Sequence, residues 1–189
     1  MTIKKIFWLS LYYGFAYYLP ATNSNYLGKI GGKLRNLCFR KIVKKCGNPI
    51  NIESHAHFGK GFNIEMGDHS CLGINCHVPN DIIIGDHVMM GPNVYILDNC
   101  THDLSVIPTG GIIPIEGRTI IGNDVWIGRQ VLFTPCKTIG NHVVIGAGSV
   151  VSKNIPDNII VAGNPIRFIR NRWDFNSNPE INQKHNGSV

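Results

Sequence analysis

A six-residue repeat runs through the middle of this chain and resumes after one interruption. Large apolar residues occupy every sixth position in two series, Met66, Leu72, Val78, Ile84, Met90 and Ile96, then Ile121, Ile127, Phe133, Ile139, Ile145 and Val151. An α-helix would repeat its apolar residues every three or four positions, so this spacing excludes a helix and predicts short strands. Hexapeptide periodicity is the sequence signature of a parallel β-helix.

A second set of smaller residues follows the large ones by four positions and is also expected to face inward. These residues are Ser70, Cys76, Val88, Val94, Cys100, Val125, Val131, Val143 and Ser149. Three hexapeptides would close one triangular coil, so the repeat predicts about four coils after an irregular first one containing Ile52 and Phe58. The unpaired strand edges at both ends need covers. We expect the N-terminal segment to cover one end and residues 154–173 to pack along the other.

Composition and charge narrow the range of partners. The formal net charge of +6 suits an anionic partner, such as a phosphorylated cofactor or an acidic membrane surface. The basic residues concentrate at the two ends and no DNA or RNA recognition motif is present, so we do not expect a nucleic-acid partner. The six cysteines form no Cys-x-x-Cys pair, which indicates reduced core thiols of a cytoplasmic protein.

The first twenty residues have an unusual composition. Lys4 and Lys5 precede an aromatic-rich stretch, residues 6–19, which Pro20 ends. The stretch is too short to span a bilayer, which takes about 20 apolar residues. Tyrosine and tryptophan favour the membrane–water boundary, so one interpretation is a helix lying on the cytoplasmic membrane face through residues 1–20. The other is a helix that caps the open end of the solenoid and buries its aromatic side chains against a neighbouring subunit. Both interpretations can hold together.

Several motifs carry a resemblance to a known family. They are residues 85–94 (GDHVMMGPNV), 101–103 (THD), 121–128 (IGNDVWIG), 145–153 (IGAGSVVSK) and 162–167 (AGNPIR). Over roughly residues 48–173 the chain resembles the hexapeptide-repeat acyltransferases, and within them the O-acetyltransferases of capsular polysaccharides and exopolysaccharides. The resemblance implies an all-β fold, a left-handed parallel β-helix with an N-terminal helical segment and a short C-terminal extension. The left hand comes from the resemblance alone, since the usual crossover is right-handed.

This reading divides the chain into three parts. Residues 1–47 form the aromatic and basic helical segment, and residues 48–173 form the β-helix with an inserted loop at 98–118. The polar tail, residues 174–189, is expected to be disordered.

His102 is the predicted general base. It stands where the repeat is interrupted, it matches the place of the family's catalytic histidine, and a neutral imidazole suits proton removal near pH 7. His69, His87 and His142 follow Gly-Asp or Gly-Asn and are expected to be solvated corner residues. His55, His57 and His77 could form a zinc site like that of the carbonic anhydrases built on this fold. Such a site needs three convergent imidazoles, which spacing alone cannot establish, and we predict no metal.

The resemblance further implies acetyl-CoA as co-substrate, bound in a groove between the subunits of a homotrimer. Trp126 would lie near the acetyl end, and cationic side chains would meet the phosphates. The predicted cofactor-binding residues are Trp126, Gly128, Arg129, Ala147, Ser152, Lys153, Arg167 and Arg170. The alternatives are a packed surface aromatic for Trp126 and an ordinary basic tail for Arg170.

For the acceptor, the predicted contacts are Asn75, Asp98 and Asn99, which could equally be turn-forming residues. The sequence thus predicts an acetyl-CoA-dependent O-acetyltransferase of a bacterial surface polysaccharide or its precursor. We expect it in the cytoplasm, where residues 1–20 could hold it peripherally at the inner face of the cytoplasmic membrane. One alternative is acetylation of a small molecule, such as a free sugar, a serine-like acceptor or an antibiotic. Another is a hexapeptide scaffold without catalytic activity.

Overall fold

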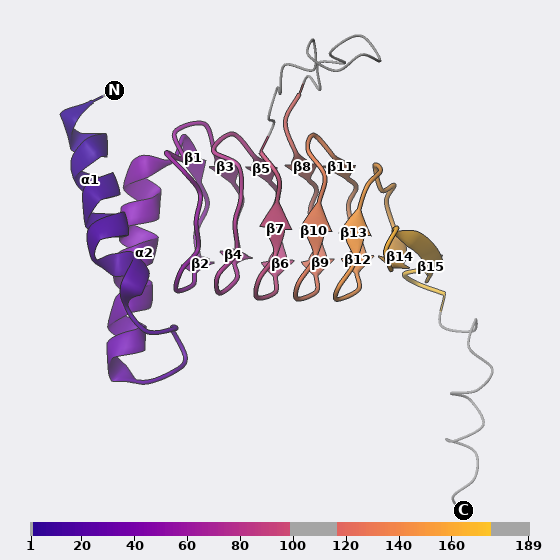
Figure 1. Ribbon diagram of the computed structural model, residues 1–189, viewed down its shortest axis with the longest axis horizontal. Coiled ribbons are helices and arrows are strands. Elements are labelled where there is room, and N and C mark those ends of the chain that lie inside the picture. Colours follow the sequence, from indigo (N-terminus) through magenta and orange to yellow (C-terminus); the bar gives the residue numbers. More distant parts are fainter. Residues whose placement is uncertain (1, 99–116, 175–189) are drawn as a thin grey trace, which may run out of the picture.

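The computed structural model describes residues 2–98 and 117–174. Short strands stack in parallel into a β-solenoid of about five turns, with two helices at its N-terminal end (Figure 1). The predicted parallel β-helix is therefore confirmed.

The helical end consists of three elements. They are α1 (Ile3–Gly14), the 3-10 helix η1 (Ala16–Tyr18) and α2 (Tyr26–Ile42). Within the described ranges, no helix combines the length and the apolarity that a bilayer crossing requires.

The strands of the solenoid are mostly two or three residues long. They are β1 (Lys45–Cys46), β2 (Ile50–Ile52), β3 (Glu65–Met66), β4 (Ser70–Leu72), β5 (Ile83–Ile84), β6 (Met89–Met90), β7 (Tyr95–Ile96), β8 (Ile120–Ile121), β9 (Trp126–Ile127), β10 (Leu132–Phe133), β11 (Thr138–Ile139), β12 (Val144–Ile145), β13 (Val150–Val151), β14 (Ile159–Ala162) and β15 (Arg167–Asn171). One wall is the sheet β1-β3-β5-β8-β11. A second consists of β2-β4 followed by β6-β9-β12-β14-β15, and the third is β7-β10-β13.

The core lies inside the coils, where the repeat places it. All twelve large repeat positions are at most 4% exposed. The eight smaller positions within the described residues are at most 1% exposed, and Cys100 lies outside those residues. Cys38 and Cys76 are buried free thiols. Burial raises the pKa of Cys38 to about 11, so this thiol stays protonated at neutral pH.

The corners are built by asparagine, aspartate and histidine. His69, His87 and His142 adopt left-handed backbone conformations, with φ of 54°, 56° and 56°, and all three are exposed as predicted. The Asx side chain at each corner reaches back to the preceding coil rather than to its own turn. Asn123 Oδ1 accepts from the Asp86 N–H at 2.8 Å, and Asn141 Oδ1 accepts from the Asn123 N–H at 2.8 Å. A column of such bonds ties successive coils together.

The glycines of the repeat serve close stacking of coils. A Cβ on Gly122 would lie 2.7 Å from the carbonyl oxygen of Gly140, and one on Gly128 would lie 2.6 Å from the backbone nitrogen of Ala147. Neither glycine has a positive φ. Glycine is needed at these positions because it lets one coil approach the next, and not because the turn requires a left-handed backbone.

Aromatic side chains seal the N-terminal end of the solenoid. Tyr12 and Phe39 pack against Phe58 of the first coil, with ring centroids 4.6 and 5.0 Å away. The Tyr12 hydroxyl donates to the Ala56 carbonyl at 2.6 Å, and the Tyr13 hydroxyl donates to the Gly59 carbonyl at 3.0 Å. The helical segment therefore caps its own solenoid, whereas the capping interpretation had placed these aromatics against a neighbouring subunit.

A buried arginine fixes the two helices to the first coil. Arg35 is fully buried, and its Nε donates to the Ile52 carbonyl at 2.8 Å. Its Nη1 donates to the Leu19 and Pro20 carbonyls at 3.0 and 3.2 Å. Glu53 lies 3.8 Å from Nη2 as the nearest carboxylate. One side chain thus joins α2, the turn after η1 and the second strand.

The C-terminal end is closed by a hairpin. β14 continues the wall of β12 in parallel, and β15 then folds back antiparallel on β14. Ile155 and Ile166 are buried against the last coil. Residues 154–173 thus pack along this end, as expected.

Candidate active site

The interruption of the repeat lies between β7 and β8. Leu97 still pairs with the next coil, its N–H donating to the Phe133 carbonyl at 3.1 Å. Asp98 is the last described residue before the interruption, and Gly117 is the first after it. His102 and Asn99 lie outside the described residues, so their roles as general base and acceptor contact stay predictions.

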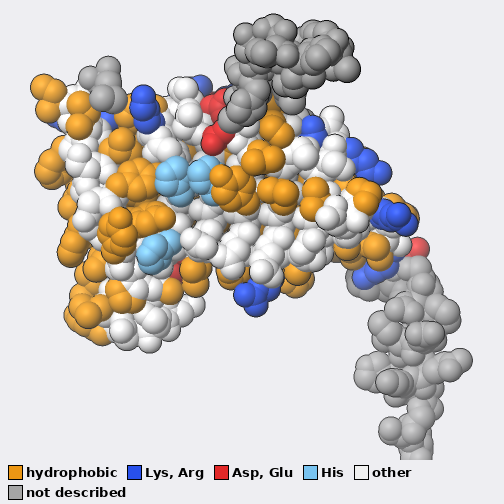
Figure 2. All heavy atoms as spheres, in the orientation of Figure 1, with side chains coloured by type: hydrophobic (Ala, Val, Ile, Leu, Met, Phe, Trp, Pro, Cys, Tyr) orange, Lys and Arg blue, Asp and Glu red, His pale blue; other side chains and the backbone are white. Residues whose placement is uncertain are grey.

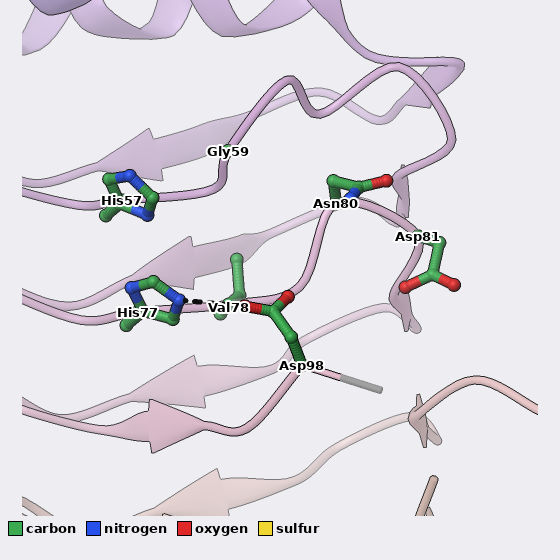
Figure 3. Close-up of a pocket in the computed structure, with 7 residues that line it drawn as sticks. All are labelled: His57, Gly59, His77, Val78, Asn80, Asp81 and Asp98. Atoms are coloured by element: carbon green, nitrogen blue, oxygen red, sulfur yellow. Dashed lines mark hydrogen bonds and ion pairs between the residues drawn. The ribbon is translucent and has the colours of Figure 1, made fainter. Parts of the chain in front are cut away.

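A polar cavity of about 240 Å³ opens where the chain leaves the solenoid (Figure 3). Its lining consists of His57, Gly59, His77, Val78, Asn80, Asp81 and Asp98. His77 Nε2 lies 3.4 Å from Asp98 Oδ2, a contact that becomes an ion pair when the imidazole is protonated. These lining residues come from three successive coils.

Flat rings form a ladder along one side of this cavity. The His57 and His77 rings stack with centroids 4.5 Å apart, and Tyr95 stacks on His77 at 4.4 Å. The three residues pair in parallel register on the outside of the third wall. Figure 2 shows the pale blue histidines beside a row of hydrophobic side chains that runs along the solenoid. His57 and His77 of this ladder line the cavity, and Tyr95 continues the stack beyond it.

Burial, followed by the neighbouring His77, lowers the pKa of His57, which Asp98 partly opposes. The Nδ1 atom of His57 is buried and has no hydrogen-bond partner among the described residues. Both features favour the neutral form of the His57 imidazole.

The three histidines considered for a metal site do not converge. His57 and His77 stack face to face, while His55 Nδ1 lies 2.9 Å from the Ser54 hydroxyl. Across residues 2–98 and 117–174, no group of three or more His, Cys, Asp or Glu side chains is placed to hold a metal ion.

Asp98 and Asn75, both predicted acceptor contacts, occupy different environments. Asp98 lines the cavity. Asn75 lies at a corner with φ of 55°, and its amide donates to Asn93 Oδ1 at 2.7 Å. Asn75 therefore has the geometry of the turn-forming alternative.

Several predicted cofactor residues occupy stacked positions on the outside of the solenoid. Trp126 projects from β9 with 54% of its surface exposed, in register with Met89 on the neighbouring coil. The corner at Gly128 and Arg129 stacks on the corner at Ala147, where the Gly148 N–H donates to the Arg129 carbonyl at 2.9 Å. These residues thus follow one another along the same side of the prism.

The remaining predicted cofactor residues surround the C-terminal hairpin. An apolar groove of about 350 Å³ is lined by Lys153, Asn154, Ile155, Pro156, Ile159, Val161, Ile166 and Phe168. Ser152 precedes Lys153, and Arg167 is the exposed first residue of β15. Lys153 is thus the cationic residue that lines the apolar groove, while Arg167 stands between the lining residues Ile166 and Phe168 without lining the groove itself.

Arg170 differs from these residues. Its Nη1 donates to the carbonyls of Asn171, Arg172 and Asp174 at 3.2, 3.3 and 2.8 Å. Arg170 thus binds backbone carbonyls at the end of its own hairpin, which differs from an ordinary basic tail, and its contact with a phosphate stays a prediction.

Sequence reasoning missed the ring ladder and the ion pairs of Arg172. Each ladder residue directly precedes an inward residue (Phe58, Val78 or Ile96), so their common repeat position was a usable signal. Arg172 binds Asp124 at 3.1 Å, which closes the hairpin onto β9. No local sequence pattern predicts that contact.

Comparison with known proteins identifies the family. The model of the bacterial transferase hexapeptide family (six repeats) matches residues 63–98 and 118–153. The galactoside O-acetyltransferase of Escherichia coli (strain K12) is 36% identical over 141 residues, which cover 72% of this chain and 68% of that protein. The putative colanic acid biosynthesis acetyltransferase WcaF of the same organism is 29% identical over 140 residues, covering 73% and 75%.

Among solved structures, a galactoside acetyltransferase in complex with coenzyme A superposes with a TM-score of 0.71 at 30% identity, covering 90% of this chain and 82% of that chain. The chain belongs to the hexapeptide-repeat acetyltransferases. This membership confirms the predicted enzyme class and the predicted use of acetyl-CoA, and it argues against a scaffold without catalytic activity.

Proposed function

We propose that this enzyme transfers the acetyl group of acetyl-CoA to a hydroxyl of a bacterial surface polysaccharide or its precursor. The observation that carries the proposal is the polar cavity at the interruption of the repeat, where imidazole, amide and carboxylate groups converge. Such groups match a ligand rich in hydroxyls. The volume of this cavity, about 240 Å³, is below the roughly 300–1,000 Å³ of pockets that bind drug-sized ligands. The cavity therefore suits one sugar unit, with the rest of a longer chain outside.

His102 is the proposed general base. It follows Asp98 by four residues, so the extended chain limits the distance between their Cα atoms to about 14 Å. The neutral imidazole accepts the proton of the sugar hydroxyl while the hydroxyl oxygen attacks the thioester carbonyl. The C–S bond then breaks, and the departing coenzyme A thiolate takes a proton from the imidazolium. A backbone N–H of a neighbouring coil would stabilise the oxyanion.

The donor site would run from Trp126 to the C-terminal groove. Lys153, which lines the groove, and the neighbouring Arg167 would supply positive charge for phosphates, and the apolar lining of the groove suits the pantetheine arm. The exposed Met89 and Trp126 side chains leave an apolar wall that a neighbouring subunit would cover in a homotrimer. Because acetyl-CoA is made inside the cell, we place the reaction in the cytoplasm.

Loss of the phosphate contacts is expected to weaken coenzyme A binding. A hydrogen bond to a charged group contributes about 1.5–3 kcal/mol, so Lys153→Gln and Arg167→Gln should each raise the Kd by tenfold or more in titration calorimetry. Lys60→Gln, which removes an exposed lysine of the first coil, is the matched control and should bind like the wild type. An unchanged Kd for coenzyme A in both variants would show that the phosphates bind at other residues.

A second candidate function is acetylation of a free sugar. The similarity to the galactoside O-acetyltransferase, at 36% identity, supports this candidate, whereas the similarity to WcaF supports the polysaccharide. Incubation with labelled acetyl-CoA separates the two acceptors. We expect label in an exopolysaccharide or its lipid-linked precursor. Label found only in free galactosides or maltose would replace the first candidate by the second.

A further inference from the structure

The N-terminal end of the molecule carries an excess of positive charge, although Arg35 and Lys44 lie near Glu53 and Glu65. Residues 1–52 contain nine lysines and arginines and no aspartate or glutamate. Only Arg35 among these nine is buried. The helices that cap the solenoid therefore present a cationic surface to their surroundings.

The same helices expose large apolar side chains. Phe7 of α1 is 60% exposed and Tyr26 of α2 is 77% exposed. Ile3, Ile30 and Leu37 are exposed as well. Ile3 and Phe7 are four residues apart, as are Tyr26 and Ile30, and Leu37 follows Ile30 by seven, so each set forms a stripe on its helix. Figure 2 shows hydrophobic side chains over much of this end. We call these five residues, with Lys29, Lys33 and Lys41, the outer cap face.

Lysines are interleaved with the apolar residues on α2. Lys33 lies between Ile30 and Leu37 on the same stripe, while Lys29 and Lys41 flank it. Aromatic and aliphatic side chains mixed with lysine are typical of helices that lie in the interface of a bilayer. Two copies apposed through this face would bring like charges together, so the charge favours an anionic partner over a second copy of the chain.

A groove on the outer cap face has the chemistry of a headgroup site. Its volume is about 440 Å³, and its lining consists of Thr22, Asn23, Tyr26, Lys29, Ile30, Gly32, Lys33 and Asn36. Two ammonium groups and the Asn23 amide can donate to phosphate oxygens, while Tyr26 and Ile30 can contact acyl chains. The Asn36 amide instead donates to the Ile50 carbonyl at 2.9 Å.

We propose that the outer cap face docks this enzyme on an anionic lipid bilayer. The apolar side chains enter the interface and the lysines bind lipid phosphates. The solenoid then projects away from the membrane, with its first coil nearest the surface. His57 and Gly59 of that coil line the acceptor cavity, so docking would hold the cavity close to a lipid-linked carbohydrate. This last step rests on the proposed function, whereas the docking itself does not.

Co-sedimentation of the full chain with vesicles tests the docking. We expect binding to vesicles of phosphatidylglycerol and phosphatidylcholine in equal parts, weak binding to phosphatidylcholine alone, and a decrease with salt. Each lysine near an anionic surface contributes about 1 kcal/mol, so Lys29→Gln combined with Lys33→Gln should lower the partition coefficient about 30-fold. Phe7→Ser combined with Tyr26→Ser should also lower it at least tenfold.

Two control variants change similar residue types away from the cap. Arg129→Gln, which removes an exposed cation of a later coil, and Ile120→Ser, on the side wall, should bind vesicles like the wild type. Equal binding by all variants, binding independent of lipid charge, or no binding by the wild type would each overturn the proposal. An oligomer that dissociates on Phe7→Ser with Tyr26→Ser, without vesicle binding, would assign the face to a second copy. Acetyl transfer to a water-soluble acceptor reports on the proposed function separately.

Discussion

Replacing His102 by asparagine is expected to lower the rate of acetyl transfer by about 10²–10⁴-fold, the contribution of a positioned general base. An amide cannot accept the hydroxyl proton at neutral pH, so attack on the thioester would depend on water. The affinity for coenzyme A should stay unchanged, because the predicted donor contacts lie on β9 and around the C-terminal hairpin.

The measurement is steady-state transfer from labelled acetyl-CoA, with calorimetry of coenzyme A on the same variant. His87→Asn is a matched control, because His87 lies at an exposed corner with φ of 56°, a conformation that asparagine tolerates. A pH profile adds a second readout: the wild-type rate should fall below the pKa of the base, and the residual rate of His102→Asn should not follow that limb. Near-normal transfer by His102→Asn would remove His102 from the proposed role.

The core could be predicted from the sequence because each coil repeats the same inward position. Leu72, Met90 and Phe133 differ in shape, yet all are buried at the sixth-residue spacing. The small inward residues followed from the same period, since Val88 and Ser149 occupy equivalent corners of the prism. A periodic fold thus makes burial readable from local spacing alone.

The packing of the helical end could be predicted from the sequence only in part. Tyr12 and Phe7 both belong to the aromatic stretch, yet Tyr12 is fully buried and Phe7 is exposed. A helix that is apolar on every side gives no periodic signal to tell the packed face from the free one. The contact with Phe58, which is distant in sequence but lies on the adjacent first coil, decides which aromatic side chains seal the solenoid.

The candidate site, too, could be predicted from the sequence only in part. Asp98 could be placed near the cavity because it borders the interruption of the repeat. The assignment of Asn75 rested on polarity alone, and a corner asparagine has the same composition signal as a ligand contact. The bond from Asn75 to Asn93 depends on the stacking of two coils, which single-residue reasoning cannot anticipate.

Replacing Arg35 by alanine is expected to cost about 3–5 kcal/mol of stability, the penalty for breaking a buried charged network. The change leaves the Ile52 and Leu19 carbonyls without their donor and removes the nearest cation from Glu53. Burial of Glu53 opposes ionisation, yet hydrogen bonds from Thr22 and Asn51, together with Arg35, hold its pKa below the usual range. Its carboxylate would therefore stay charged beside an empty site.

Thermal unfolding followed by circular dichroism measures this effect. For a chain of this size a loss of 1 kcal/mol lowers the Tm by about 2–4 °C, so a decrease on the order of 10 °C is expected. Lys33→Ala, an exposed change on the same helix, should alter stability by no more than about 0.5 kcal/mol. Arg35→Lys should restore little, because an ammonium cannot reproduce the planar fork that reaches several carbonyls. Melting of Arg35→Ala at the wild-type temperature would mean that water satisfies these carbonyls.

The part of the protein that Arg35→Ala destabilises distinguishes a structural role for Arg35 from a catalytic one. In a solenoid each coil contacts only its neighbours, so loosening the N-terminal cap should propagate weakly toward the C-terminal hairpin. Below its melting temperature, Arg35→Ala should therefore keep the wild-type affinity for coenzyme A, whose proposed groove lies at the opposite end. It should lose helical signal and vesicle binding together, because both depend on the cap. Loss of coenzyme A binding with an intact helical signal would contradict this assignment, since it would link Arg35 to the donor site rather than to the cap.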